Sequence, residues 1–259
     1  MKKALLTFCC LSLLQVLHAQ NMAGTITYTE TMKMNIDLSG DVDVQANGNV
    51  DAEQIRNMMP KEQHTKRVLY YNADAALYTN DKKSAVENHD IEQNDGNMRM
   101  VFKVAVPEDI VYTSLKDAHR IEQRDFMGRK FLITSDIDQP KWKMTGNQKT
   151  ILGYPCQEAV LMKGKDTLTA WFTAAIPVSI GPQGFRGLPG MILEAKQNSQ
   201  LEIIADDVVF GTDNNKLIVK PKGGKKVTRD EYEKIVEEKQ KEMMKENGGS
   251  NSVIIKLGR

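Results

Sequence analysis

Apolar and polar residues alternate with a period of two along much of the chain, as Thr31–Leu38 illustrates. This period places the apolar side chains of a strand on one face. The pattern predicts strands at Gly24–Thr29, Thr31–Leu38, Arg67–Asn72, Ala76–Thr79, Met98–Val106, Val111–Leu115, Arg129–Ser135, Gln157–Lys163, Thr167–Thr173, Met191–Lys196 and Leu201–Phe210. Lys163–Asp166 is the strongest hairpin signal between them. We therefore expect a mainly β (α+β) fold, a single twisted antiparallel sheet or half-barrel with a C-terminal helix.

Two segments have a helical pattern instead. Asp51–Met59 predicts a short helix that ends at Pro60. Thr228–Glu231 forms a capping box, with a hydroxyl at the N-cap and a carboxylate three residues later. The helix that follows should reach about Glu246, and its interrupted apolar stripe favours packing against the sheet over binding of a partner.

Residues 1–19 have the pattern of a signal peptide. Lys2 and Lys3 precede a mostly apolar run, and Ala19 is the small residue expected before the cleavage site. The run is too short to span a bilayer, and no later segment approaches 18 apolar residues. Cys9 and Cys10 lie inside this run, which argues against a lipoprotein. We expect an exported protein, periplasmic or envelope-associated, without a transmembrane segment.

The mature chain is expected to hold a β-rich domain at 20–221, with 222–259 as a C-terminal helix and terminal strand packed on the same domain. The formal net charge is +1, and removing Lys2 and Lys3 with the signal peptide leaves −1. A chain so close to neutral has no global polycation for nucleic acid, so we predict no nucleic-acid partner. Cys156 is the only cysteine after the signal peptide, so the core must stabilise the fold without an internal disulfide.

Five lysines surround Gly223-Gly224. They are Lys216, Lys220, Lys222, Lys225 and Lys226. A solvated linker is the favoured interpretation, and contact with an anionic lipid or polyanion is the alternative.

Glycine and proline are most concentrated in Gly181–Gly190, which holds four of the 18 glycines and two of the eight prolines. This density requires an irregular, specified backbone path. Glycine recurs every third residue, as in collagen, but over too few repeats for a collagen triple helix. No Gly-Lys-Ser/Thr follows, so the segment is not a phosphate-binding loop. The loop is either a structural corner, which we favour, or a contact surface. Its motif residues are Gly181, Pro182, Gly187, Leu188, Pro189 and Gly190.

No catalytic or metal-binding pattern is recognisable. His64, His89 and His119 are scattered and lack metal-ligand spacing. Asp43–Gln54 matches a calcium loop only in part, because its last position lacks the bidentate carboxylate. Cys156 fits a small buried side chain better than a nucleophile. We therefore predict no catalytic residues, no metal and no cofactor.

Large apolar side chains gather in the middle of the chain, where core packing is the first interpretation. The second is an apolar groove beside the glycine loop, where glycine lets a ligand approach the backbone. In that case the candidate binding residues are Trp171, Phe185, Arg186 and Leu188.

Several separated motifs follow one another in order. They are Trp142, Ile151–Gln157, Ala170–Thr173, Ile176-Pro177, Gly181-Pro182 and Gly187–Leu193. In this order the chain resembles the GLPGLI family (Porph_ging domain) of exported Bacteroidetes proteins, whose name corresponds to Gly187–Ile192 with Met191 in place of the usual leucine. Lys222–Tyr232 extends the resemblance toward the C-terminus. Weaker matches in the N-terminal half are Tyr28, Met59-Pro60 and Leu77-Tyr78. The resemblance implies export from a Gram-negative cell, and it brings no established activity, so no catalytic residues carry over.

Three hypotheses for function remain. The leading one is a non-enzymatic envelope or periplasmic protein that binds an apolar or peptide-like ligand or an outer-membrane partner, with the Gly181–Gly190 loop shaping the binding surface. The second is a periplasmic hydrolase whose acids or histidines converge only in the fold. The third is a purely structural envelope component.

Overall fold

The computed structural model describes residues 22–37, 61–81, 108–137, 139–211, 214–246 and 254–257. Most of these residues are in strands, and α3 (Arg229–Glu246) is the helix at the C-terminal side. The strands are β1 (Gly24–Asp37), β2 (Glu62–Tyr71), β3 (Ala75–Asn80), β4 (Ile110–Ser114), β5 (His119–Phe126), β6 (Arg129–Asp136), β7 (Lys143–Ile151), β8 (Tyr154–Lys163), β9 (Asp166–Thr173), β10 (Met191–Gln197), β11 (Leu201–Phe210), β12 (Lys225–Thr228) and β13 (Ile254–Leu257). The short 3₁₀ turn η2 (Pro182–Gly184) lies between β9 and β10. The predicted mainly β class with a C-terminal helix is confirmed.

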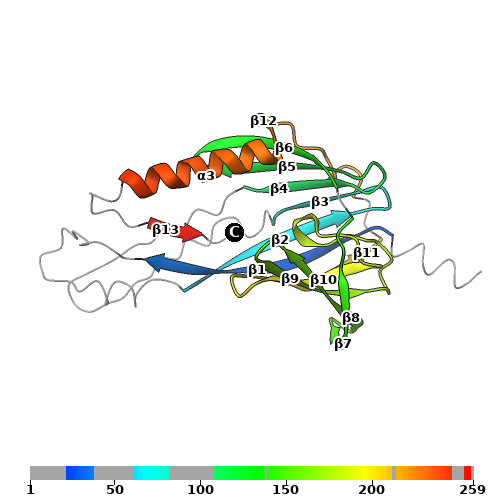
Figure 1. The fold of residues 1–259 in the computed structure, drawn as a ribbon. Coiled ribbons are helices and arrows are strands. Elements are labelled where there is room, and N and C mark those ends of the chain that lie inside the picture. The colour runs from blue at the N-terminus through cyan, green and yellow to red at the C-terminus, as the bar shows by residue number, and fades with distance from the viewer. Residues whose placement is uncertain are drawn as a thin grey trace, which may run out of the picture.

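The strands form one open sheet in the order β12-β6-β5-β4-β3-β2-β1-β11-β10-β9-β8-β7, and β13 pairs with the end of β1 (Figure 1). The pairings are antiparallel except for β12 with β6, which is parallel. β1 is the centre of the order, with β2 on one edge and β11 on the other. We call the strands from β2 to β12 the first arm and those from β11 to β7 the second arm.

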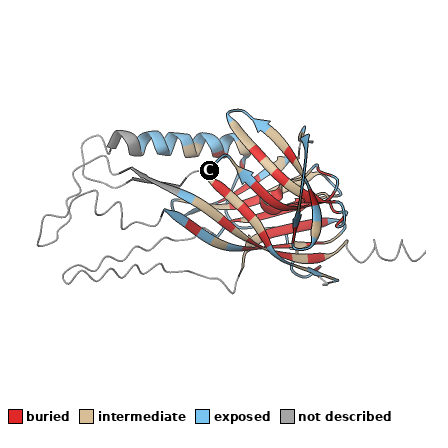
Figure 2. Ribbon diagram, turned by 90° about the horizontal axis from the view of Figure 1, so that it is seen from below, coloured by how far each residue is buried: buried red, intermediate tan, exposed pale blue. Residues whose placement is uncertain are grey.

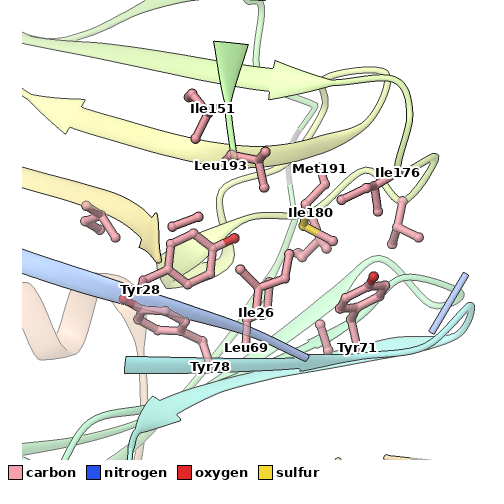
Figure 3. Packing of buried hydrophobic residues seen from close by; sticks show 14 of the residues in the cluster. Ile26, Tyr28, Leu69, Tyr71, Tyr78, Ile151, Ile176, Ile180, Met191 and Leu193 are labelled. Atoms are coloured by element: carbon pink, nitrogen blue, oxygen red, sulfur yellow. The ribbon is translucent and has the colours of Figure 1, made fainter. Parts of the chain in front are cut away.

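The main hydrophobic core lies where the two arms curl toward each other. It includes Ile26 and Tyr28 of β1 and Leu69 of β2, together with Met191 and Leu193 of β10. Figure 3 shows these side chains facing one another across the core. Bulges between Thr27 and Tyr28 and between Ile192 and Glu194 interrupt the strand registers. Such bulges increase local twist, which helps one sheet to close over its own core.

The helix covers the far end of the first arm. Tyr232 of α3 packs edge-on against Phe131 of β6, with ring centroids 5.4 Å apart, in a cluster that includes Ile133 and Val227. Figure 2 shows the buried residues gathered within the curled sheet, while much of α3 is exposed. Among the described residues no helix is long and apolar enough to cross a membrane.

Several local predictions are confirmed. The capping box is formed, because the Glu231 amide donates to Thr228 Oγ1 at 3.2 Å and the Thr228 amide donates to Glu231 Oε2 at 2.8 Å. The β8–β9 hairpin turns at Gly164, whose φ is +64°. The two strands expected before residue 39 are one strand, β1.

The alternation pattern missed three strands, β5, β7 and β12, which carry many charged or polar residues. The strand predicted at Met98–Val106, the helix predicted at Asp51–Met59, the partial calcium loop Asp43–Gln54 and His89 lie outside the described residues.

Candidate functional site

The Gly181–Gly190 loop connects the two arms of the sheet. Its η2 turn contacts β3 and β4 of the first arm and β10 of the second. The Phe185 amide donates to the Pro182 carbonyl at 3.0 Å, which closes the turn. Ile180 and Arg186 then form an isolated antiparallel bridge that returns the chain toward β10.

Steric limits explain the glycines at both ends of this loop. A Cβ on Gly181 would lie 2.6 Å from the Cβ of Ile192. A Cβ on Gly190 would lie 2.1 Å from the Thr173 carbonyl oxygen, and Gly190 also has a φ of +151°. Gly187 has a φ of +89°, and a Cβ there would lie 2.9 Å from the Pro140 ring. Any residue larger than glycine would require the backbone or the neighbouring atoms to move at each of these positions. These contacts support the structural-corner hypothesis.

The four predicted binding residues do not converge on one surface. Leu188 is buried in a small cluster with Phe172 and Ile192, and Phe185 packs against that cluster. Trp171 packs instead against the main core, where the Lys149 ammonium lies 4.3 Å from its ring centroid. The structure thus brings Phe185 and Leu188 together and leaves Trp171 apart.

Arg186 differs from the other three because its charged group is partly enclosed. Its carbonyl accepts a hydrogen bond from Trp142 Nε1 at 2.8 Å. Its Nε and Nη1 are buried and have no hydrogen-bond partner. The enclosed nitrogens face protein rather than a surface that a ligand could reach.

A groove of about 530 Å³ lies beside Pro189, across the ends of β7, β8 and β9. It is lined by Gln148, Lys149, Thr150, Pro155, Cys156, Gln157, Phe172, Thr173, Ala174, Ala175 and Pro189. Apolar groups dominate the lining, and the glutamine and threonine side chains supply donors and acceptors. Its size falls within the range of small-ligand sites.

The groove borders β7, the last strand of the second arm (Figure 1). Among the described residues β7 pairs only with β8, so its other edge is open. A register shift lies between Met144 and Gln148, where Thr145 Oγ1 and Asn147 Nδ2 donate to Glu158 Oε2 at 2.7 and 2.6 Å. An open edge presents backbone donors and acceptors to a further extended segment.

A second unusual feature is a buried network of charges on the first arm. β5 carries Arg120, Glu122 and Arg124 at alternate positions, which places them on one face. Glu122 is 2% exposed. Its Oε2 accepts from Arg124 Nε and Nη2 at 3.0 and 2.9 Å, and its Oε1 accepts from Arg229 of α3. Arg124 Nη1 also donates to Asp109 Oδ2 at 2.6 Å.

The network extends across the sheet to β1. Arg67 of β2 donates to the Asp109 carbonyl at 3.4 Å and to Asn80 Oδ1. Its Nε lies 3.5 Å from Glu30 Oε2, which also accepts from the Tyr78 hydroxyl at 3.1 Å. Charged and polar groups therefore connect β1 with α3 through the interior.

The loop and the network meet at Gly184. Arg120 Nη2 donates to the Gly184 carbonyl at 2.5 Å, and Arg120 Nη1 lies 3.6 Å from Glu122 Oε1. A Cβ on Gly184 would lie 3.1 Å from both Arg120 Nε and Val111 Cγ1. Arg120 thus fixes the turn of the loop to the charge network.

The electrostatics of the network favour fixed charges over proton transfer. Burial by itself would raise the pKa of Glu122, but Arg124, Arg229 and Arg120 outweigh burial and leave that pKa lowered. Burial, followed by the charge of Glu30, raises the pKa of Tyr78 well above its usual value. At neutral pH Glu122 is therefore ionised and Tyr78 neutral, which suits structural pairing better than general acid–base catalysis.

Of the other candidates for chemistry, the two described histidines lie apart from both features, whereas Cys156 lines the groove. His64 is exposed and His119 partly so; His64 Nε2 lies 4.0 Å from Glu62 Oε2, and His119 Nδ1 lies 3.5 Å from Asp136 Oδ1. Cys156 is buried, and burial raises the pKa of its thiol. Within the described ranges no group of three or more His, Cys, Asp or Glu side chains could hold a metal ion.

Sequence reasoning missed both the charge network and the open edge at β7. The alternation Arg120-x-Glu122-x-Arg124 was a usable signal, because a period of two can mark one face of a strand whatever its polarity. The partners of these residues, Asp109 just before β4 and Arg229 of α3, are brought close only by the tertiary fold, so no sequence pattern indicates them.

Comparisons with known proteins bear on the fold and on the loop. Two solved structures of PNGF-II, in two space groups, resemble the chain with TM-scores of 0.50 and 0.47, each at 17% identity. The matches cover 83% and 82% of this chain, which spans about one third of the length of each PNGF-II chain (33% and 32%). At this identity the likeness concerns the fold alone. No curated protein matches the chain.

The family comparison concerns the second arm. Residues 162–194, from the end of β8 into β10, match the family described as "Protein of unknown function (Porph_ging)". The matched range contains the whole Gly181–Gly190 loop and five of the residues that line the groove, Phe172, Thr173, Ala174, Ala175 and Pro189. The chain therefore carries a Porph_ging segment at residues 162–194, and the resemblance inferred from its sequence motifs is confirmed there.

Proposed function

We propose that this protein is a non-enzymatic, exported envelope protein that binds a peptide-like ligand at the groove beside Pro189 and the open edge of β7. The observation that carries the proposal is the contact between the two features: Gln148, Lys149 and Thr150 belong to β7 and also line the groove. An extended peptide can pair with a strand edge through its backbone while one of its side chains occupies an adjoining pocket.

The composition of the groove supports a peptide over a strongly charged ligand. Phe172, Pro155 and Pro189 supply apolar surface, and Gln157 supplies an amide that can pair with a peptide group. Lys149, the one charged residue in the lining, is already paired with Glu194 at 2.6 Å and lies over Trp171. The Lys149 ammonium is therefore already balanced by groups of the protein itself.

The role of the Gly181–Gly190 loop in this proposal is to position the groove wall. Pro189 lies directly between the buried Leu188 and the sterically fixed Gly190. A wall held in this way is pre-organised, which reduces the ordering cost of binding. Phe185, Arg186 and Leu188 then act through packing and not through contact with the ligand.

The experiment is selection of a random peptide library on the immobilised mature protein, residues 20–259, followed by affinity measurement of the selected peptides. Ala174→Arg places a long charged side chain in the groove, and Val209→Arg makes the same change at a position that is 45% exposed on β11 and outside it. We expect Ala174→Arg to weaken binding at least about tenfold, with Val209→Arg unchanged.

Other results would favour the competing hypotheses. Peptides that bind both variants equally would place the site elsewhere. Failure to select any peptide, with Ala174→Arg leaving envelope integrity unchanged in the native host, would contradict the binding role. Turnover of selected peptides by the wild-type protein would favour the hydrolase hypothesis.

A further inference from the structure

A second surface lies on the first arm, where residues 214–224 cross the outer side of the sheet and lead into β12. It carries five exposed lysines and no acidic residue between Lys216 and Lys226. Leu217 and Val219 are 47% and 56% exposed. We refer to Lys216–Lys226 as the basic strip.

The strip is held against the sheet and is not a free linker. Its start is anchored by Asn214, which is buried and whose Nδ2 donates to the Gly24 carbonyl and, at 3.2 Å, to Thr25 Oγ1. The Leu217 and Ile218 amides donate to the Asn214 carbonyl at 2.8 and 2.9 Å. Ordering of this kind means that the exposed side chains keep a fixed arrangement.

Contacts along the strip decide which side chains face the protein. Ile218 packs with Leu77 and Tyr112 on the outer side of the sheet. At the other end Lys225–Thr228 is β12, which pairs in parallel with β6, and Gly224 approaches the Lys130 carbonyl so closely that a Cβ would lie 2.7 Å away. Because Ile218 points inward, its neighbours Leu217 and Val219 are left in solvent.

The charges of the strip are largely unpaired. None of its five lysines makes an ion pair with a described carboxylate, although Lys220 lies 5.4 Å from the Tyr112 ring centroid. Asp74 and Asp117 lie near enough to Tyr112 to act on it electrostatically, so two negative charges lie in the region of Lys220. The strip as a whole carries five positive charges. The surface combines an excess of positive charge with two exposed apolar side chains.

We propose that the basic strip docks on an anionic lipid surface. Lysines near such a surface are attracted to the headgroups, and exposed apolar side chains between them can enter the interfacial region. A soluble polyanion would use the lysines alone and would have no use for Leu217 and Val219. This inference is independent of the peptide groove, which lies on the second arm.

The test is sedimentation of the mature protein with phosphatidylcholine vesicles, with and without phosphatidylglycerol. We expect binding only to the vesicles that contain phosphatidylglycerol. Replacing Lys216, Lys220 and Lys222 by Gln should weaken it roughly 100-fold, since each lysine contributes about fivefold. The double change Leu217→Ser and Val219→Ser should weaken it about tenfold. Raising the ionic strength from about 0.1 M to about 1 M should remove the part of vesicle binding that depends on the lysines, because salt screens their attraction to the headgroups.

The matched control removes three lysines from α3, where Lys234, Lys239 and Lys241 each pair with a glutamate of the same helix. Their replacement by Gln should leave vesicle binding within about twofold of wild type. Equal loss in the control would mean that net charge, and not the strip, causes binding. Absence of vesicle binding would overturn the proposal. So would a protein that binds heparin and whose vesicle binding is unaffected by Leu217→Ser and Val219→Ser.

Discussion

The Gly181–Gly190 loop and the charge network of β5 meet at the Gly184 carbonyl, yet different forces hold them in place. The loop is held by steric exclusion, since Gly181 and Gly190 leave no room for a Cβ. The network is held by charge, since Glu122 is enclosed by three guanidinium groups. Steric fit depends on residue size and can be seen in a sequence, whereas charge pairing depends on partners that only the fold brings together.

Gly190 is the position in the loop where a larger residue should destabilise the protein most. Gly190→Ala should lower the free energy of unfolding by about 4 kcal/mol, because the new Cβ would meet the Thr173 carbonyl and φ would be strained. Urea denaturation followed by tryptophan fluorescence measures this loss. The control is Gly153→Ala, where φ is also positive (+82°) but nothing lies within 4 Å of the added Cβ, and the loss should be about 1 kcal/mol. Equal losses would mean that φ, and not the contact, requires glycine at 190.

The network should respond strongly to the loss of its central charge. Glu122→Gln keeps the shape of the side chain but leaves Arg124 and Arg229 without their shared carboxylate. We expect a loss of about 3 kcal/mol in unfolding free energy, measured in the same denaturation experiment. Glu202→Gln removes a carboxylate from a more exposed pair with Lys196 and should cost no more than about 1 kcal/mol. A small loss for Glu122→Gln would show that water replaces the missing charge.

The two regions should also differ in their response to acid. The pKa of Glu122 is lowered in the folded protein, so its contribution is present above the usual value of 4.5 and is lost as pH falls through the folded pKa. The stability difference between wild type and Glu122→Gln should therefore be full at pH 7 and shrink below pH 4.5. The difference between wild type and Gly190→Ala should stay nearly constant over the same range. A constant Glu122→Gln difference would contradict the assignment of this carboxylate as an ion-pair partner.

The smallest expected effect lies at the start of α3, which supplies Arg229 to the network. Thr228→Ala removes the N-cap hydroxyl and should cost about 1 kcal/mol, while Thr228→Ser should cost little. Thermal unfolding followed by circular dichroism would detect the change. A loss as large as that of Glu122→Gln would indicate that the cap also holds Arg229 in place.

Much of the fold could be predicted because its strands bury one apolar face. β1 and β11 show the alternation clearly, and the capping box and the Gly164 hairpin are local features that do not depend on distant residues. The loop was also predictable, since only an unusual backbone requires so many glycines.

The remaining elements were hidden because their side chains are polar. β7 is an exposed edge strand, and β5 carries charges that resemble a solvated face in the sequence but pair with Asp109 and with Arg229 of α3 in the fold. Phe185 and Leu188 were predicted as contacts with a ligand, and in the fold Leu188 is buried and Phe185 packs against its cluster. Their binding role stays a prediction, and the nearby Pro189 is the loop residue that lines the groove.

The central place of β1 has a consequence for how the chain acquires its fold. One of its neighbours, β2, is the next described strand in the sequence, whereas the hydrogen bond between Thr29 and Asp206 of β11 joins residues 177 positions apart. The antiparallel meander from β2 to β6 pairs strands that succeed one another in the sequence, but β1 cannot complete its pairing until β11 is available. Contacts of such long range slow folding and prolong the exposure of unpaired edges. A chain truncated before residue 201 should therefore be recovered as a folding-incompetent, aggregation-prone species, even though it keeps most of its strands.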